Sequence, residues 1–186
     1  MKKELRILGI DDCPFNKFRD KKVKVIGAFF RGGNFIDGVM SAEADVDGTN
    51  STARIAAMIN RSRFRPQIQA VFIDGIAVGG FNIIDIESLH KNTKLPVIVV
   101  IRRLPDLKKI HLTLRKLGME KKIALLEKAG EPVKMGKIYV QYKGINGEKV
   151  QELLKLTCTH SFIPEPIRVA HLIGQGITLG ESRGSA

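Results

Sequence analysis

The stretch Ile7-Leu8-Gly9-Ile10-Asp11-Asp12 is the most informative part of the sequence, because a short apolar run stops abruptly at two aspartates. The stretch Val71-Phe72-Ile73-Asp74-Gly75 repeats the same pattern further along the chain. Runs of this kind are typical of buried strands that end in a functional loop. Polar groups at the carboxyl ends of parallel strands face the crevice where an α/β sheet binds ligands. We therefore expect an α/β sheet with an acidic centre at Asp11 and Asp74.

The residues between these stretches predict a hairpin and a helix. Residues 23–30 and 35–44 alternate between apolar and polar side chains and flank the turn Arg31-Gly32-Gly33-Asn34. Apolar residues then fall at helical spacing, which predicts a helix over 51–61. The apolar run 95–101 indicates a strand buried on both faces. The result is a mixed sheet, three antiparallel strands followed by parallel ones, with helices on both faces.

The remainder of the chain predicts mainly helices. The helix expected over 107–117 has an apolar face and a basic outer surface. We further expect helices over 83–89, 120–128 and 148–156, a strand over 137–142, and a last helix opened by Pro164-Glu165-Pro166. A short polar tail, 180–184, closes the pattern, either disordered or folded back toward the acidic centre.

Composition limits the classes of protein that the chain fits. With 186 residues and 44% hydrophobic content, it is long enough for one sizeable core, so we expect a single domain over 1–186. No apolar run reaches the roughly 18 residues of a membrane span, and the first run meets Asp11 too soon for a signal peptide. Cys13 and Cys158 stand far apart, without a disulfide framework or zinc motif. These features predict a cytoplasmic protein.

The chain is strongly basic. It carries 31 Lys and Arg against 19 Asp and Glu, a net charge of +12, and residues 101–186 hold 16 basic and 8 acidic side chains. This charge favours a polyanionic partner, and we expect DNA or RNA. A Lys-rich thermophile surface and an acidic protein partner are the alternatives. The sequence leaves the oligomeric state open.

Asp11 and Asp74 suggest a metal site if their strands are neighbours. Adjacent strands lie roughly 4.8 Å apart, so the two carboxylates would converge on one point. Like charges so close repel each other unless a cation lies between them, and divalent ions with oxygen ligands are the usual occupants. We infer Mg²⁺ or Mn²⁺. The alternative is that each aspartate only caps a turn, as Asp74-Gly75 does in many proteins.

Several segments resemble a known family over essentially the whole chain. They are Gly9-Ile10-Asp11-Asp12, Phe30-Arg31-Gly32-Gly33, Asp47-Gly48-Thr49-Asn50-Ser51-Thr52, Ile73-Asp74-Gly75-Ile76, Gly80-Phe81-Asn82-Ile83-Ile84-Asp85 and Pro164-Glu165-Pro166-Ile167-Arg168-Val169-Ala170-His171-Leu172. Together they resemble the uncharacterised archaeal family catalogued as domain of unknown function 99, which is itself similar to endonuclease V. The resemblance implies a ribonuclease H-like fold and a metal-dependent hydrolase that nicks nucleic acid near deaminated adenine.

The resemblance also implies roles for particular residues. Asp11 and Asp74 match metal-binding aspartates of endonuclease V, and Arg102 stands near its basic residue. The segment that holds Arg168 and His171 is similar to the carboxyl-terminal helix of endonuclease V, so both are candidate substrate-binding residues, with packing as the alternative for His171.

The hairpin turn adds two further candidates. Arg31 and Gly32 could offer backbone N–H groups to a phosphate, although a plain hairpin turn is the commoner meaning.

The departures from endonuclease V concern the third acidic ligand. Asn50 stands where that enzyme carries a glutamate, and it is either a neutral metal ligand or, as we favour, a helix N-cap. Asp47 is the nearby acid that could replace the glutamate as a catalytic group. Residues 77–80 replace a His-Pro-Arg-type element, and no Tyr-Ile-Pro-Gly wedge is recognisable.

Two functional hypotheses follow. The first is a divalent-metal-dependent nuclease that acts on DNA or RNA through Asp11 and Asp74. The alternative is a nucleic-acid-binding module of the same fold whose catalysis is weakened by the loss of the third acid. On that interpretation Asn50→Asp should tighten Mn²⁺ binding, since it adds a negative charge.

Overall fold

The computed structural model describes residues 4–183, and its centre is a seven-stranded mixed sheet with the strand order β3-β2-β1-β4-β7-β9-β8. The strands are β1 (Arg6–Asp12), β2 (Lys22–Arg31), β3 (Phe35–Asp45), β4 (Ala70–Asp74), β7 (Val97–Ile101), β8 (Val133–Met135) and β9 (Ile138–Lys143). The first three strands form an antiparallel meander, and β1, β4 and β7 are parallel. This arrangement confirms the sheet predicted from the sequence.

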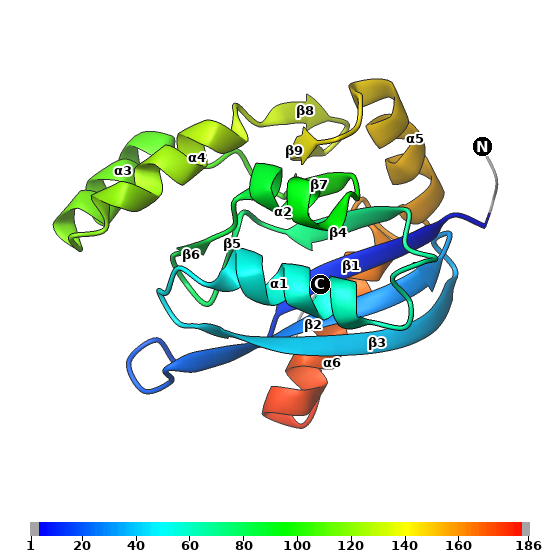
Figure 1. The fold of residues 1–186 in the computed structure, drawn as a ribbon, viewed down its shortest axis with the longest axis horizontal. Coiled ribbons are helices and arrows are strands. Elements are labelled where there is room, and N and C mark those ends of the chain that lie inside the picture. The colour runs from blue at the N-terminus through cyan, green and yellow to red at the C-terminus, as the bar shows by residue number, and fades with distance from the viewer. Residues whose placement is uncertain (1–3, 184–186) are drawn as a thin grey trace.

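Helices cover both faces of the sheet (Figure 1). They are α1 (Ser51–Arg61), α2 (Ile86–Thr93), α3 (Leu107–Lys116), α4 (Ile123–Ala129), α5 (Gly147–Thr157) and α6 (Glu165–Leu179). Helices α1 and α2 pack on one face, and α5 and α6 pack on the other.

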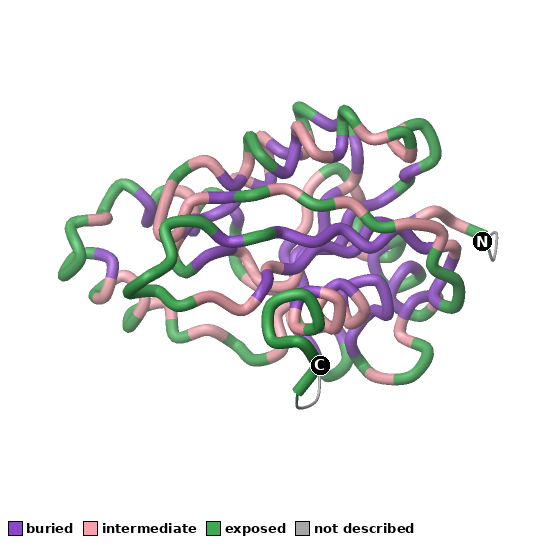
Figure 2. The backbone as a smooth tube through the Cα atoms, turned by 90° about the horizontal axis from the view of Figure 1, so that it is seen from below, coloured by how far each residue is buried: buried purple, intermediate pink, exposed green. Residues whose placement is uncertain are grey.

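The two faces follow from the alternation of side chains along the strands. Leu8 and Ile10 of β1 pack with the larger core cluster under α1 and α2. Ile7 of β1 and Phe72 of β4 belong to the second cluster, under α5 and α6. Because side chains alternate with a period of two, Asp11 and Asp74 must point to the side of α6. Figure 2 shows that buried residues concentrate in the strands, with exposed segments around them.

Gly9 lets α6 lie directly on β1. A Cβ atom at Gly9 would lie 2.1 Å from the backbone carbonyl carbon of Pro166, so no side chain fits between the strand and the helix. Two strand residues beyond Gly9 span roughly 6.6 Å, and five helix residues beyond Pro166 span roughly 7.5 Å. The close contact therefore carries His171 to the level of Asp11.

Three details of the predicted elements were wrong. The helix expected from Ile83 begins at Ile86, because Ile83 belongs to β6 (Asn82–Ile83), which pairs with β5 (Ala77–Val78). The helix expected over 120–128 is a 3-10 turn (Glu120–Lys122) followed by α4. The edge strand β8 was not predicted, since three residues are too few to show a pattern.

Other predictions concern the chain as a whole. Among residues 4–183, no helix combines the length and the apolar character that a membrane crossing requires. Both cysteines have free thiols, Cys13 buried and Cys158 partly buried. Of the predicted tail, residues 181–183 follow α6 in an exposed position, and Gly184 lies outside the described residues.

Candidate metal centre

Asp11 and Asp74 end neighbouring parallel strands, as predicted. Ile10 lies beside Ile73 in the register of β1 and β4, and each aspartate follows directly. His171 of α6 joins them: one ligand atom from each of the three side chains lies within 4.8 Å of the others. The prediction that the two carboxyl groups approach each other is therefore confirmed.

Hydrogen bonds fix each side chain of this cluster. The Asp11 carboxylate holds His171 Nδ1 at 2.7 Å through Oδ2 and accepts the Asp12 backbone N–H at 2.9 Å through Oδ1. With Nδ1 protonated, the imidazole orients the carboxylate and leaves Nε2 free. On the other side, Arg102 donates from a guanidinium nitrogen to Asp74 Oδ2 at 2.7 Å. Arg102, predicted just beyond the fifth strand of the sequence pattern, thus lies at the centre.

The charges of the cluster are not balanced. Asp11 is only 6% exposed, and burial raises its pKa from 3.8 to about 6, with a further increase from the charge of Asp74. The hydrogen bond with Asp11 in turn raises the pKa of His171. Burial opposes the ionised carboxylate, so the site favours whatever supplies positive charge to it: a proton, the imidazolium or a cation.

Asp47 and Asn50 belong to a different network. Asn50 Oδ1 accepts hydrogen bonds from the Asp45 backbone N–H and from Asn82 Nδ2, both at 3.0 Å. Asn50 is the N-cap residue of α1, as favoured from the sequence, but its side chain makes no hydrogen bond to the first turn of the helix. Asp47 Oδ1 accepts the Phe81 backbone N–H at 2.7 Å. These bonds do not bring Asp47 or Asn50 into the cluster of Asp11, Asp74 and His171.

Lys122 completes that network, and no sequence pattern pointed to it. Its ammonium donates to the backbone carbonyls of Asp47, Gly48 and Phe81 at 2.6, 2.8 and 2.7 Å. The side chain is buried, and burial lowers its pKa. Lys122 therefore joins the loop before α1 to the β5–β6 hairpin. We refer to Asp47, Asn50, Asn82 and Lys122 as the loop lock.

Three of the candidate substrate-binding residues lie apart from the centre or are already paired. Arg31 pairs with Arg6 in the register of β1 and β2, so it lies roughly 17 Å along the sheet from the level of Asp11. Its guanidinium pairs with Asp37, and the Gly32 backbone N–H donates to Leu5. Arg31 and Gly32 are thus already paired within the sheet, at the turn between β2 and β3.

The third of these residues, Arg168, lies on α6 itself. Its guanidinium makes hydrogen bonds of 2.8 to 3.0 Å to both carboxylate oxygens of Glu165. Glu165 is almost fully buried, so this pair anchors the start of α6.

Exposed basic residues flank the centre. The chain leaves β7 through Arg102 and enters α3, which projects with α4 from the body of the molecule (Figure 1). The exposed basic side chains of this arm are Lys108, Lys109, Arg115, Lys116, Lys121 and Lys128, of which Lys128 pairs with Asp85.

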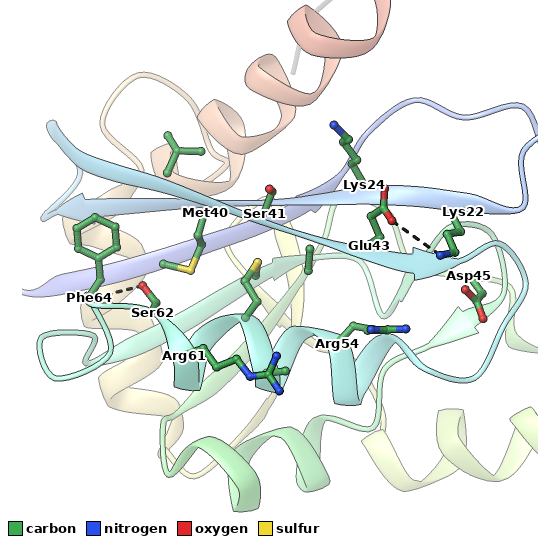
Figure 3. Close-up of a pocket in the computed structure, with 14 residues that line it drawn as sticks. Lys22, Lys24, Met40, Ser41, Glu43, Asp45, Arg54, Arg61, Ser62 and Phe64 are labelled. Atoms are coloured by element: carbon green, nitrogen blue, oxygen red, sulfur yellow. Dashed lines mark hydrogen bonds and ion pairs between the residues drawn. The ribbon is translucent and has the colours of Figure 1, made fainter.

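A hollow of about 670 Å³ lies apart from the acidic cluster, along the free edge of β3 and over α1 (Figure 3). It mixes the basic side chains of Lys22, Lys24, Arg54 and Arg61 with the acidic side chains of Glu43 and Asp45. None of the three residues of the acidic cluster lines it. The hollow is therefore separate from the candidate metal centre, despite its size.

Comparisons with known proteins agree with this geometry. The family model described as endonuclease dU matches residues 3–178. A Methanosarcina mazei protein of an uncharacterised family is 45% identical over 193 residues, covering 100% of this chain and 97% of its own. The crystal structure of an Archaeoglobus fulgidus protein of unknown function has a TM-score of 0.87 and 38% identity, covering 94% of this chain and 98% of that chain.

A more distant match identifies the fold. The crystal structure of Ciona intestinalis endonuclease V in complex with an inosine-containing DNA has a TM-score of 0.57 at 14% identity, covering 90% of this chain and 82% of that chain. The fold is thus the ribonuclease H-like fold of endonuclease V. The family model and the close relatives together show that the chain belongs to the endonuclease dU family, an archaeal family whose fold is that of endonuclease V.

Proposed function

We propose that this chain is a divalent-metal-dependent endonuclease that hydrolyses a phosphodiester bond in nucleic acid containing a deaminated base. The observation that carries the proposal is the convergence of Asp11, Asp74 and His171 within 4.8 Å at the carboxyl ends of adjacent strands. The family description names dU, which we take as deoxyuridine, and the Ciona enzyme was crystallised on DNA containing inosine. Both are nucleosides whose bases arise by deamination, so strands containing either one belong in the first assays.

The donor set fits a divalent ion. Ligands at 2.0–2.6 Å from one ion lie at most about 5 Å apart, and the three donor atoms satisfy this limit. Carboxylates suit Mg²⁺ and Mn²⁺, while an imidazole ligand favours Mn²⁺ or another transition metal over Mg²⁺. Asp11, Asp74 and, through Nε2 or after a change of partner, His171 would hold the ion. When bound there, the ion lowers the pKa of a water ligand and stabilises charge on a phosphate.

The remaining residues of the site would position the carboxylates and neutralise the charge of the phosphates. His171 orients Asp11 through Nδ1, as partners of ligating carboxylates commonly do. Arg102 shares Asp74 with the cation site, and its remaining N–H groups are free to donate to a phosphate oxygen. The exposed lysines of the α3–α4 arm attract the backbone of the nucleic acid without reading its sequence.

The test is cleavage by Asp74→Asn. Asparagine keeps a carbonyl oxygen for Arg102 but removes the negative charge. We expect Mn²⁺ affinity to fall and single-turnover cleavage of deoxyuridine- and inosine-containing strands to drop at least about 100-fold, the scale typical of losing a group that stabilises developing charge. Asp37→Asn, at the opposite end of the sheet, is the matched control and should cleave like the wild type.

Two outcomes would contradict the proposal. Unchanged Mn²⁺ binding by Asp74→Asn would mean that Asp74 only caps its turn. A wild-type protein that binds these strands but cuts none of them with Mg²⁺ or Mn²⁺ would be the nucleic-acid-binding module instead.

A further inference from the structure

Phe18 is the most exposed of the large apolar residues in the described part of the chain. Its side chain is 86% exposed, whereas the next in order, Leu104, is 60% exposed. Leaving a phenyl ring in water costs free energy, because the ring's apolar surface remains hydrated. An exposed aromatic ring of this kind therefore calls for a ligand or a structural reason.

The turn that carries Phe18 is closed without help from the ring. Asn16 Oδ1 accepts the Phe18 backbone N–H at 3.0 Å, and Asp20 Oδ2 accepts the Asn16 backbone N–H at 2.7 Å. The Asn16 carbonyl also accepts the backbone N–H groups of Arg19 and Asp20. The backbone of the turn is thus preorganised, and it holds the ring outward, which lowers the entropy lost on binding.

The turn lies at the same end of the sheet as the acidic centre. The chain leaves β1 directly after Asp11 and Asp12, passes through this loop, and returns as β2 (Figure 1). Residues 14–18 and Asp20 border a hollow of about 570 Å³ together with Thr178 and Leu179, at the last turn of α6. The helix that carries His171 therefore also forms one wall beside Phe18.

The charges around the ring are mostly positive. Lys17, Arg19 and Lys21 are exposed next to it, and the Lys17 ammonium lies over one face of the ring, 4.9 Å from its centroid, while the ring as a whole stays 86% exposed. The acidic side chain of the turn, Asp20, is engaged with Asn16. An aromatic face surrounded by cations is the combination that binds an unpaired nucleobase and its phosphates.

We propose that Phe18 stacks on an unpaired nucleobase of the substrate strand, beside the phosphodiester that the acidic centre attacks. This inference rests on the proposed function for the identity of the substrate as nucleic acid. It adds a requirement: the base at this position must leave its stack, so single strands and weakened pairs are preferred over intact duplex.

The experiment uses the absence of tryptophan from the sequence. In Phe18→Trp, the indole is the only tryptophan, and stacking on a base should quench its fluorescence. The variant is titrated with a single-stranded deoxyuridine-containing oligonucleotide without divalent ions, so cleavage plays no part. Phe35→Trp is the matched control, because Phe35 is 58% exposed beside Arg31 at the opposite end of the sheet.

We expect saturable quenching at position 18 and little change at position 35. Relative to the wild type, Phe18→Ala should bind the same strand about tenfold more weakly, whereas Phe35→Ala should bind it equally well, because only the first variant loses a ring that stacks on a base. Equal responses at the two positions, unchanged affinity of Phe18→Ala, or no binding by the wild type would each overturn the inference.

The inference and the proposed function fail separately. Cleavage by the wild type that is unaffected in Phe18→Ala would remove the stacking role and leave the nuclease intact. Quenching at position 18 in a protein that cuts nothing would do the opposite.

Discussion

The candidate metal centre and the loop lock are both polar clusters, but they differ in how their charges are balanced. In the loop lock, the Lys122 ammonium has a backbone carbonyl for each of its three N–H groups, and Asn50 and Asn82 bond to each other. In the metal centre, Asp11 is buried at a pKa of about 6 beside a second carboxylate. The donors and acceptors of the lock are paired with each other, whereas in the centre two carboxylates share one guanidinium and one imidazole, and burial opposes the charge on Asp11.

This contrast distinguishes polar clusters that hold the fold together from polar clusters that are candidates for function. Buried polar groups are normally satisfied by hydrogen bonds, so burial of a polar residue alone indicates only that it has partners. A buried group whose pKa is strongly shifted, near other ionisable groups, is a candidate for function. Asp47 and Asn50 looked functional by position, yet the structure gives them internal partners.

The largest expected effect comes from opening the loop lock. Lys122→Met keeps the length and apolar stem of the side chain but leaves three backbone carbonyls without their donor. Losing a buried charged donor should lower the free energy of unfolding by about 3–5 kcal/mol. Urea unfolding measures this, with the exposed neighbour Lys121→Met as the control. A loss below about 1 kcal/mol would mean that water replaces the ammonium.

A substitution in the candidate metal centre should change the free energy of unfolding with the opposite sign. Because the folded-state pKa of Asp11 is raised above 3.8, the folded protein holds this proton more tightly than the unfolded chain, and stability falls as pH rises from about 4 to about 6. Asp11→Asn removes that cost, so at pH 8 without divalent ions it should stabilise the protein by about 1–3 kcal/mol.

Thermal unfolding at two pH values tests this sign. The gain from Asp11→Asn should disappear near pH 4, where the wild-type carboxyl is protonated. Mn²⁺ should raise the melting temperature of the wild type and not that of the variant. A variant that is less stable than the wild type at pH 8 would show that the bond to His171 outweighs burial.

The exposed basic arm provides a smaller effect. Lys108 and Lys116 are in water, unlike the buried Lys122, so their charges are available to phosphates. Replacing both by Gln should reduce the slope of log K against log salt for single strands by about 1.4, because each phosphate that is no longer neutralised lowers it by roughly 0.7. Binding measured at several salt concentrations gives the slope. An unchanged slope would place the nucleic acid elsewhere on the protein.

The smallest effect is expected at Asn50. The sequence favoured tighter Mn²⁺ binding by Asn50→Asp, but Oδ1 of Asn50 already accepts two hydrogen bonds inside the loop lock. An aspartate can accept the same bonds, so we expect its Mn²⁺ affinity to lie within about twofold of the wild type, since exposed or distant charges are screened. Calorimetric titration of both proteins decides this. A clear gain in affinity would bring residue 50 back as the third ligand.

The strands could be predicted because they carry strong local patterns. The apolar runs before Asp11 and Asp74 and the alternation around Arg31-Gly32 identified the sheet, and the order of elements indicated its parallel core. The pair of short strands at Ala77–Val78 and Asn82–Ile83 escaped prediction because each has two residues and depends on the glycines between them, both with positive φ.

The site could be predicted only where strand ends define it. Asp11 and Asp74 follow from the sheet, but the hydrogen bond of His171 depends on how closely α6 lies on β1, which is a tertiary property. Lys122 stands in a Lys121-Lys122 pair that is typical of solvent-exposed charge, and only the packing of two loops distinguishes the second from the first. Contacts between distant segments leave no periodic trace in a sequence.

The close packing of α6 on Gly9 determines when the acidic cluster can form during synthesis. Asp11 and His171 are 160 residues apart in the sequence, so a ribosome must add that much chain after Asp11 before the two can meet. The sheet's first strands can pair during synthesis, since chains begin to fold from the N-terminus. The cluster of Asp11, Asp74 and His171 cannot form until α6 has been made. A nascent or truncated chain therefore lacks the complete centre, and any nucleic acid near the ribosome meets only an unfinished one.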